Sequence, residues 1–240
     1  GVLLLFSNLH FKESLSVDNR KRGNLKSLVS GFGIVLKNRR YVYYVLQMGF
    51  AMGVLFANIS SSPFIVQQHY GFSAFEFSLF FGINALAIGL AAGLSVKFKN
   101  PEHAMFLGSV GMTMMSAVEF VILSNEYHFA VYEAVLFVLL FSMGLTFTAS
   151  TTLAMDCERA NSGTASALFG AAGFAFGGIV SPLVGLGDIL STTGLIFFVC
   201  SVCSLCFSVL AMNQTHTNLW GSFKCKMGPV TRFVFLRREK

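Results

Sequence analysis

Three glutamates stand inside long apolar stretches of the sequence, where an ionisable side chain is costly and therefore a candidate for function. Glu76 begins one stretch, where we expect it to reach headgroup water. Glu119 lies near the end of a second stretch, and Glu133 lies near the start of the stretch that follows it. Both are therefore expected roughly 7 Å below the same membrane boundary by helix rise. Two interpretations stay open. The carboxylates reach interfacial water, or they sense a proton or a cationic substrate.

Amide side chains form a second group of candidates. Gln47 and Asn58 share one face of an apolar stretch, and Asn84 shares the face of another with aromatic residues. A lone amide in lipid loses hydrogen bonds to water, so all three should point inward, toward helix–helix hydrogen bonds or toward a small-molecule cavity. The residues that we expect to line a substrate cavity are Gln47, Phe50, Asn58, Phe81, Asn84, Glu133 and Phe141.

Residues typical of enzymes and metal sites are poorly placed. All five histidines fall in loops, turns or tails, where none can meet a buried nucleophile: His10, His69, His103, His128 and His216. The run from Cys200 to Cys206 superficially resembles an iron–sulfur motif, but it lies in an apolar stretch with no fourth cysteine. No nucleotide-binding loop is present. We therefore expect no catalytic residue, no metal and no cofactor.

The composition is that of an integral membrane protein. Hydrophobic residues make up 54% of the chain and charged residues 12%, about half the charged fraction of a soluble domain. Six apolar segments are long enough to cross a bilayer as helices. They are Tyr41–Ser62, Ala74–Val96, Ala104–Ser124, Phe129–Ser150, Gly163–Leu186 and Ile189–Met212. The sequence thus predicts an all-α bundle of six transmembrane helices in contact with the lipid bilayer.

The 17 Lys and Arg residues fall on one side of these spans. By the positive-inside rule that side is the cytoplasm, so both termini are expected there. Residues 10–40 read as a basic cytoplasmic loop, and residues 213–240 as a basic cytoplasmic tail. An amphipathic helix in the loop suits anionic headgroups better than nucleic acid; its apolar face is Leu25, Leu28, Val29, Phe32, Val35 and Leu36. Residues 1–9 are too short to span and read as the end of a preceding transmembrane helix.

The fifth span is rich in glycine. Gly170, Gly173 and Gly177 share one helical face, which lets a neighbouring helix approach closely, and Pro182 predicts a kink near one end. The face serves either tight packing or a helix that slides during gating. In the turn before this span, Asp156, Glu158 and Arg159 form either a cytoplasmic gate or an ordinary solvated turn.

Several short motifs resemble one family in order and spacing. They are His10-Phe-Lys-Glu-Ser-Leu15, Ala57-Asn-Ile-Ser-Ser-Ser-Pro63-Phe64, Phe80-Phe-Gly-Ile-Asn84 and Gly163-Thr-Ala-Ser-Ala-Leu-Phe-Gly170. Together they are similar to stretches of the bicyclomycin-resistance type (Bcr/CflA) drug:proton antiporters of the major facilitator superfamily. The resemblance implies that the six spans are helices 7–12, the C-terminal half of such a transporter.

The same resemblance implies a partner and a function. The partner is the missing N-terminal six-helix half, which in this superfamily usually carries the proton-coupling acid. The implied function is efflux of drugs or small amphipathic metabolites across the bacterial inner membrane, driven by the proton gradient. Glu133 falls on a cavity-lining helix by this analogy, and Glu119 on a peripheral one. An alternative is an inactive truncated fragment, or a six-helix scaffold that transports nothing.

Overall fold

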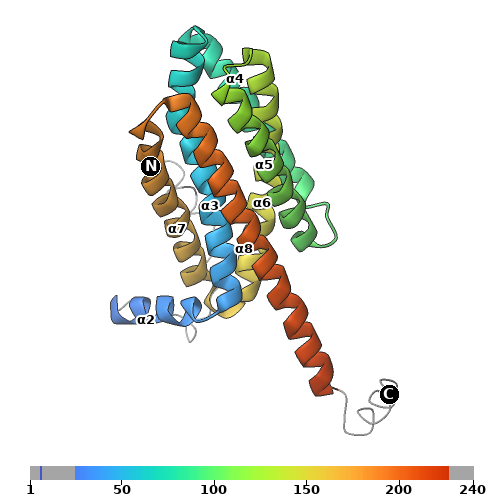
Figure 1. Cartoon of the computed structure of the whole chain (residues 1–240). Helices are drawn as coiled ribbons and strands as arrows, with labels where there is room; N and C mark the ends of the chain where they lie inside the picture. Colours follow the sequence, from blue (N-terminus) through green and yellow to red (C-terminus); the bar gives the residue numbers. More distant parts are fainter. Residues whose placement is uncertain (1–5, 7–24, 227–240) are drawn as a thin grey trace, which may run out of the picture.

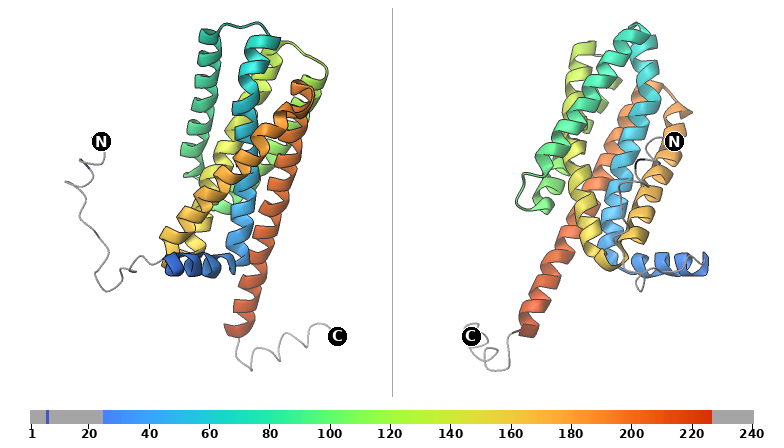
Figure 2. Two further views of the ribbon diagram at one scale, coloured as in Figure 1. Left: turned by 90° about the vertical axis from the view of Figure 1, so that its left-hand side faces the viewer. Right: turned by 180° about the vertical axis from the view of Figure 1, so that it is seen from behind.

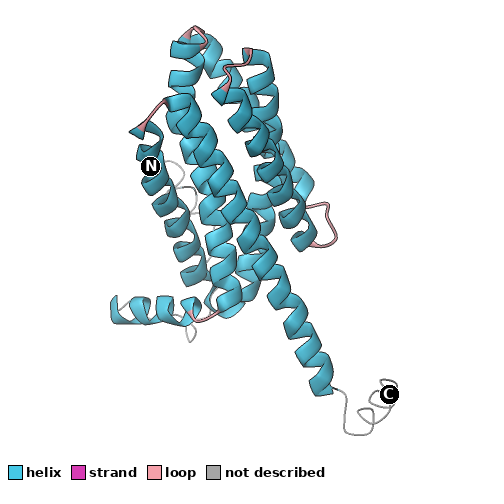
Figure 3. Ribbon diagram, in the orientation of Figure 1, coloured by secondary structure: helices cyan, strands magenta, loops and turns pink. Residues whose placement is uncertain are grey.

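The computed structural model describes residue 6 and residues 25–226, with the backbone alone for residues 25–29 and 215–226. The predicted helix end in residues 1–9, residues 10–24 of the predicted basic loop and residues 227–240 of the tail lie outside the described part, apart from Phe6. Within that part every regular element is helical (Figure 3).

Six helical segments are long and apolar enough to cross a membrane, which confirms the predicted fold class. In chain order the elements are α2 (Leu25–Leu36), α3 (Arg39–Pro63), η2 (Phe64–His69), α4 (Ala74–Ser95), α5 (Pro101–Ser124), α6 (Phe129–Cys157), η3 (Arg159–Asn161), α7 (Ser162–Leu183), η4 (Val184–Leu186) and α8 (Ile189–Lys226).

Two helices form the centre of the bundle. Helix α3 packs against α6, α7 and α8, and α6 packs against α3, α4 and α5, so α3 and α6 are the most buried spans. The flanking helices α4 and α7 each pack mainly against one of them, α4 against α6 and α7 against α3. Figures 1 and 2 show α2 lying across the lower end of the bundle.

Small residues set the distances between neighbouring helices. A Cβ at Gly108 on α5 would lie 2.3 Å from the hydroxyl of Thr146 on α6. In lipid the hydrophobic effect does not drive helices together, so close backbone approach and interhelical hydrogen bonds have to hold the bundle. Hydroxyl groups supply such bonds: Thr113 donates to the carbonyl of Ser201 on α8 (3.1 Å), and Ser95 to that of Leu145 (3.2 Å).

Helix starts follow the capping residues in the sequence. The Ser73 hydroxyl accepts from the backbone N–H of Glu76, and Glu76 accepts from the Ser73 backbone N–H at 2.8 Å. This capping box begins α4 and satisfies two backbone donors. Asn38 caps α3, and Pro101 occupies the first turn of α5. Glu76, one of the three glutamates singled out above, is thus an exposed capping residue.

The end of the first span differs from the sequence prediction. The predicted span ends at Ser62, directly before Pro63, but the helix continues to His69. Its last part is a widened turn with hydrogen bonds five residues apart, such as Tyr70 N–H to Ile65 O (3.0 Å). Proline lacks a backbone N–H and crowds the preceding turn. A widened turn accommodates that loss while the chain stays helical.

Candidate functional site

An amide and a carboxyl meet between α4 and α6. Asn84 Nδ2 donates a hydrogen bond of 2.9 Å to Glu133 Oε1. The remaining acceptor of each group, Asn84 Oδ1 and Glu133 Oε2, is buried without a hydrogen-bond partner among the described residues. Farther down the same interface Gly144 holds the two helices in close contact. This pair joins two residues that the sequence placed in one substrate cavity.

A second carboxyl lies behind this pair. The Glu119 side chain on α5 is 0% exposed, and neither of its oxygens has a hydrogen-bond partner in the described part of the chain. Glu119 and Glu133 are close enough to interact electrostatically, and both interact with the buried hydroxyl of Tyr132. An unpaired charge is expensive in such a place. Sequence reasoning ranked Glu119 below Glu133 and missed Tyr132, although Tyr132 adjoins Glu133 in the chain.

A cluster of aromatic rings adjoins the carboxyls, because it includes Tyr132 and Tyr70. The ring of Tyr70 lies 5.2 Å from that of Phe129 and 5.7 Å from that of Tyr132, and its hydroxyl donates to the carbonyl of Tyr127 at 2.9 Å. Phe72 and Phe80 complete the cluster around Phe129. Burial raises the pKa of Tyr70, and the charges of Glu119 and Glu126 raise it further. Two members of the cluster, Tyr70 and Tyr132, thus interact electrostatically with Glu119.

Gln47 is placed elsewhere, in a buried polar network that joins α3 to three other helices. Its Nε2 donates to Ser204 on α8 at 3.1 Å and to Ser109 on α5 at 3.5 Å. Ser150 on α6 donates to its Oε1. Every polar atom of the Gln47 side chain therefore has a partner, as the helix-packing interpretation requires.

The other predicted cavity residues do not converge on Asn84. Asn58 is buried, and its Oδ1 accepts from Ser62 of the same helix at 2.9 Å. Phe50 stacks between α7 and α8, with its ring centroid 4.9 Å from Phe176 and 5.8 Å from Phe207.

On the α4–α6 side, Phe81 is 39% exposed and contacts the ring of Phe77 on its own helix. Phe141 is half-buried on α6. Among the described residues no hydrogen bond joins the three amides to one another.

Two of the three glycines predicted to share a packing face on α7 lie close to α3. A Cβ at Gly177 would lie 2.3 Å from the ring of Phe56 on α3, and one at Gly173 would lie 3.3 Å from Met52. Gly170 departs from the packing prediction, because it is exposed and a Cβ there would meet nothing within 4 Å. The buried face of α7 continues through Phe169 and Ala165, so Gly170 lies beside the packing face and not on it. Pro182 is exposed near the end of α7.

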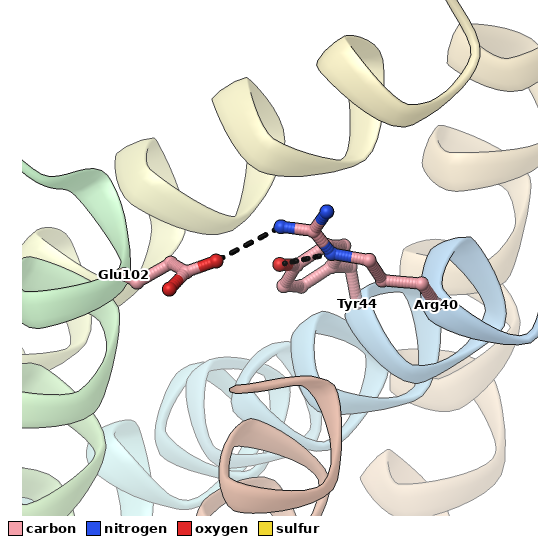
Figure 4. Close-up of polar contacts among 3 residues, drawn as sticks. All are labelled: Arg40, Tyr44 and Glu102. Carbon is pink, nitrogen blue, oxygen red and sulfur yellow. Dashed lines mark hydrogen bonds and ion pairs between the residues drawn. The ribbon is translucent and has the colours of Figure 1, made fainter. Parts of the chain in front are cut away.

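Polar side chains at the lower end of the bundle connect helices through an ion pair and through a hydroxyl group. Arg40 on α3 donates to Glu102 on α5 at 2.8 Å and to the hydroxyl of Tyr44 at 3.1 Å (Figure 4). Sequence reasoning missed this bridge, although opposite charges at the starts of two neighbouring helices could have indicated it. The hydroxyl of Tyr41 donates to the carbonyl of Ala165 on α7 at 2.7 Å.

The predicted gate residues lie close to this bridge. Asp156 and Arg159 form a pair of 3.0 Å within one turn, with both side chains largely exposed. Glu158 accepts from Asn38 at 2.8 Å and so connects the end of α6 to the start of α3. The structure thus brings Glu158 to another helix but leaves Asp156 and Arg159 paired with each other.

Comparison with known proteins identifies the family. The sequence profile of the Major Facilitator Superfamily matches residues 1–182. The chain belongs to the major facilitator superfamily. Membership in this superfamily supports a transport function.

One relative in this superfamily is the uncharacterized MFS-type transporter YdgK of Bacillus subtilis. It is 33% identical to the chain over 222 residues, which cover 90% of this chain and 55% of the relative. The chain therefore spans about half the length of the relative that it matches.

Proposed function

We propose that this chain is the C-terminal six-helix half of a secondary transporter that exports drugs or other small amphipathic molecules in exchange for protons. Superfamily membership and the half-length match support a transporter repeat. The motifs quoted above favour the drug:proton antiporters. The proton gradient serves as the driving force, and no cofactor takes part.

The observation that carries this proposal is the asymmetry of the bundle. Helices α3 and α6 are enclosed, whereas α4 and α7 present large apolar side chains such as Leu86, Leu90, Phe174 and Ile179 to the outside. In transporters of this kind one repeat rocks against another around a site between them. A second six-helix unit that packs on α4 and α7 would place Glu133 and Asn84 near that interface.

The pair Asn84–Glu133 is the proposed point of contact with substrate. Sparse polar groups among aromatic side chains are typical of small-molecule sites, and Phe81 and Phe141 lie on the same two helices. A carboxylate in lipid attracts organic cations. Gln47, Phe50 and Asn58 remain cavity predictions, and Glu158 remains a prediction for the cytoplasmic gate, together with Asp156 and Arg159.

We further propose that the protein lies in the bacterial inner membrane and that the end of the bundle where α2 lies faces the cytoplasm. In the order of the six spans, the α4–α5 loop with Lys97 and Lys99 and the α6–α7 turn with Arg159 fall on the same side as α2, the side that the positive-inside rule assigns to the cytoplasm. Single cysteines near His69, Tyr127 and Gly187 should react with an impermeant thiol reagent added from outside, and cysteines at Lys99 and Arg159 should not. External labelling at Lys99 would reverse the orientation.

Flux measurements test transport itself. Vesicles that hold this chain alone should show no proton-driven efflux, because one repeat cannot alternate access by itself. Vesicles that also hold an N-terminal half of the superfamily should show it. Robust flux from the chain alone would contradict the half-transporter proposal, and no flux from any combination would favour the inactive fragment or scaffold.

Substitutions of two amides separate the substrate site from packing. Asn84→Leu should change which compounds are exported while folded yield is kept. Gln47→Leu is the matched control, and it should lower yield and depress export of all compounds equally. A uniform loss for Asn84→Leu that tracks yield would remove Asn84 from the substrate site.

A further inference from the structure

The contact between Asn84 and Glu133 is incomplete in a specific way. One hydrogen bond joins Nδ2 of the amide to Oε1 of the carboxyl. The two atoms left over, Asn84 Oδ1 and Glu133 Oε2, are both buried, and neither has a partner among the described residues. An ionised carboxylate can only accept hydrogen bonds, and the amide oxygen likewise only accepts. What the pair lacks is a donor.

One hydrogen atom would supply that donor. A carboxylic acid and a primary amide can form two antiparallel hydrogen bonds, with N–H donating to one carboxyl oxygen and the acid O–H donating to the amide oxygen. Protonation also removes a charge from a buried position within a membrane-spanning segment, where an unpaired carboxylate is expensive.

Glu119 strengthens the case for a proton. Its carboxyl is fully buried, both its oxygens lack partners in the described part of the chain, and it interacts electrostatically with Glu133 and with Tyr132. Two carboxylates that share one site cannot both ionise without mutual repulsion. The groups recorded as interacting with them are Tyr132 on α6 and Tyr70 after η2. The exposed Glu126 of the α5–α6 loop interacts with Tyr70.

We propose that Asn84, Glu133 and Glu119 form a proton-binding site within this half of the transporter, in which Glu133 exchanges the proton and Asn84 holds the protonated form. The proposal deepens the proposed function, because it assigns to this chain a proton that the family resemblance places in the missing half. The proton comes from water and returns to water, and no other bond changes. Glu133 is the exchanging group because its side chain is half-buried, whereas Glu119 is enclosed behind it.

Infrared difference spectroscopy of the full chain in lipid bilayers, titrated with acid and base, tests the proposal without any transport assay. At neutral pH the spectrum should contain the carbonyl stretch of buried protonated carboxyls. Glu133→Gln should abolish one such band and one titrating group per chain, and Asn84→Ala should shift the remaining Glu133 band in frequency and in titration midpoint. Glu126→Gln, at an exposed loop residue, is the matched control and should leave the buried bands unchanged.

Glutamine at residue 133 can reproduce both hydrogen bonds of the protonated pair, so the variant is expected to fold. If it does not fold, Asn84→Ala decides the question alone. A spectrum that is identical in wild type, Glu133→Gln and Asn84→Ala would overturn the proposal. The outcome is independent of flux: a titrating pair in a chain that never supports transport refutes the proposed function only, and proton-driven flux with an unchanged spectrum refutes the proton site only.

Discussion

Gly144 on α6 faces the backbone of Ile88 on α4 so closely that a Cβ at Gly144 would lie 2.5 Å from the carbonyl oxygen of Ile88. The neighbouring atom belongs to the backbone, so it cannot swing away as a side chain could. This contact fixes the separation of the two helices that carry Asn84 and Glu133.

Gly144→Ala is therefore expected to push α4 away from α6. Overpacking of this kind costs about 1–3 kcal/mol, and it should also lengthen the Asn84–Glu133 hydrogen bond. The apparent melting temperature in detergent measures the first effect. Gly170→Ala, where an added Cβ meets nothing within 4 Å, is the control and should leave melting unchanged or raise it slightly. Equal melting of Gly144→Ala and wild type would contradict the contact.

Two adjacent glycines of α7 offer a matched comparison. Gly177 faces the ring of Phe56 at 2.3 Å from the Cβ position, whereas the Cβ position of Gly178 meets nothing within 4 Å. Gly177→Ala should destabilise the α3–α7 contact by about 1–3 kcal/mol, and Gly178→Ala should be neutral. Thermal unfolding of both variants, compared with wild type, measures the difference. Similar effects at the two positions would indicate that α7 does not pack on α3 through this face.

The buried network around Gln47 predicts a purely structural cost. Gln47→Leu leaves Ser150 and Ser204 without their bonds to the amide, which should cost about 1–3 kcal/mol. The exposed Gln68 is the control, and Gln68→Leu should change little. Titration with a denaturing detergent would compare the two variants. A cost at Gln68 as large as that at Gln47 would argue against the network.

The ion pair between Arg40 and Glu102 should show measurable coupling. Its side chains are only 28% and 20% exposed, so solvent screens the pair less than a surface pair. A double-mutant cycle with Arg40→Gln and Glu102→Gln should give a coupling energy of about 1 kcal/mol. The same cycle on Asp156 and Arg159, with side chains 52% and 80% exposed, should give almost none at physiological salt. A larger coupling in the second cycle would be the opposite of this expectation.

Asp188 gives a pH dependence with a definite sign. The backbone N–H of Ser191 donates to its carboxylate at 2.9 Å, and this bond, with the hydroxyl of Ser191, lowers the pKa of Asp188 below its ordinary value of 3.8. A lowered folded-state pKa contributes stability that is present above 3.8 and is lost as pH falls through the lower folded-state value. Melting temperatures between about pH 5 and about pH 2 should fall less steeply for Asp188→Asn than for wild type. Parallel curves would exclude this contribution.

The sequence predicted the six spans and their helical class because membrane length and apolar composition are local properties. It also identified Asn84 and Glu133, since polar groups in apolar stretches are conspicuous. It could not show that these two meet while Gln47 binds serines of three other helices, because pairing depends on which helix faces align. For the same reason the sequence did not predict the Arg40–Glu102 ion pair or the absence of a packing neighbour at Gly170.

The widened turn after Pro63 also determines how the chain tolerates changes in length. In an α-helix each residue added or removed rotates everything beyond it by about 100°. The turn at Phe64–His69 already departs from α-helical register, so deletion of one of its residues would let the segment return to ordinary winding and rotate Tyr70 away from Phe129 and Tyr132. A deletion there would move Tyr70 away from Glu119, with which it interacts electrostatically, while the sequences of α4, α5 and α6 stay unchanged. Homologous transporters with a shorter turn at this point should therefore lack the contact of Tyr70 with Phe129 and Tyr132.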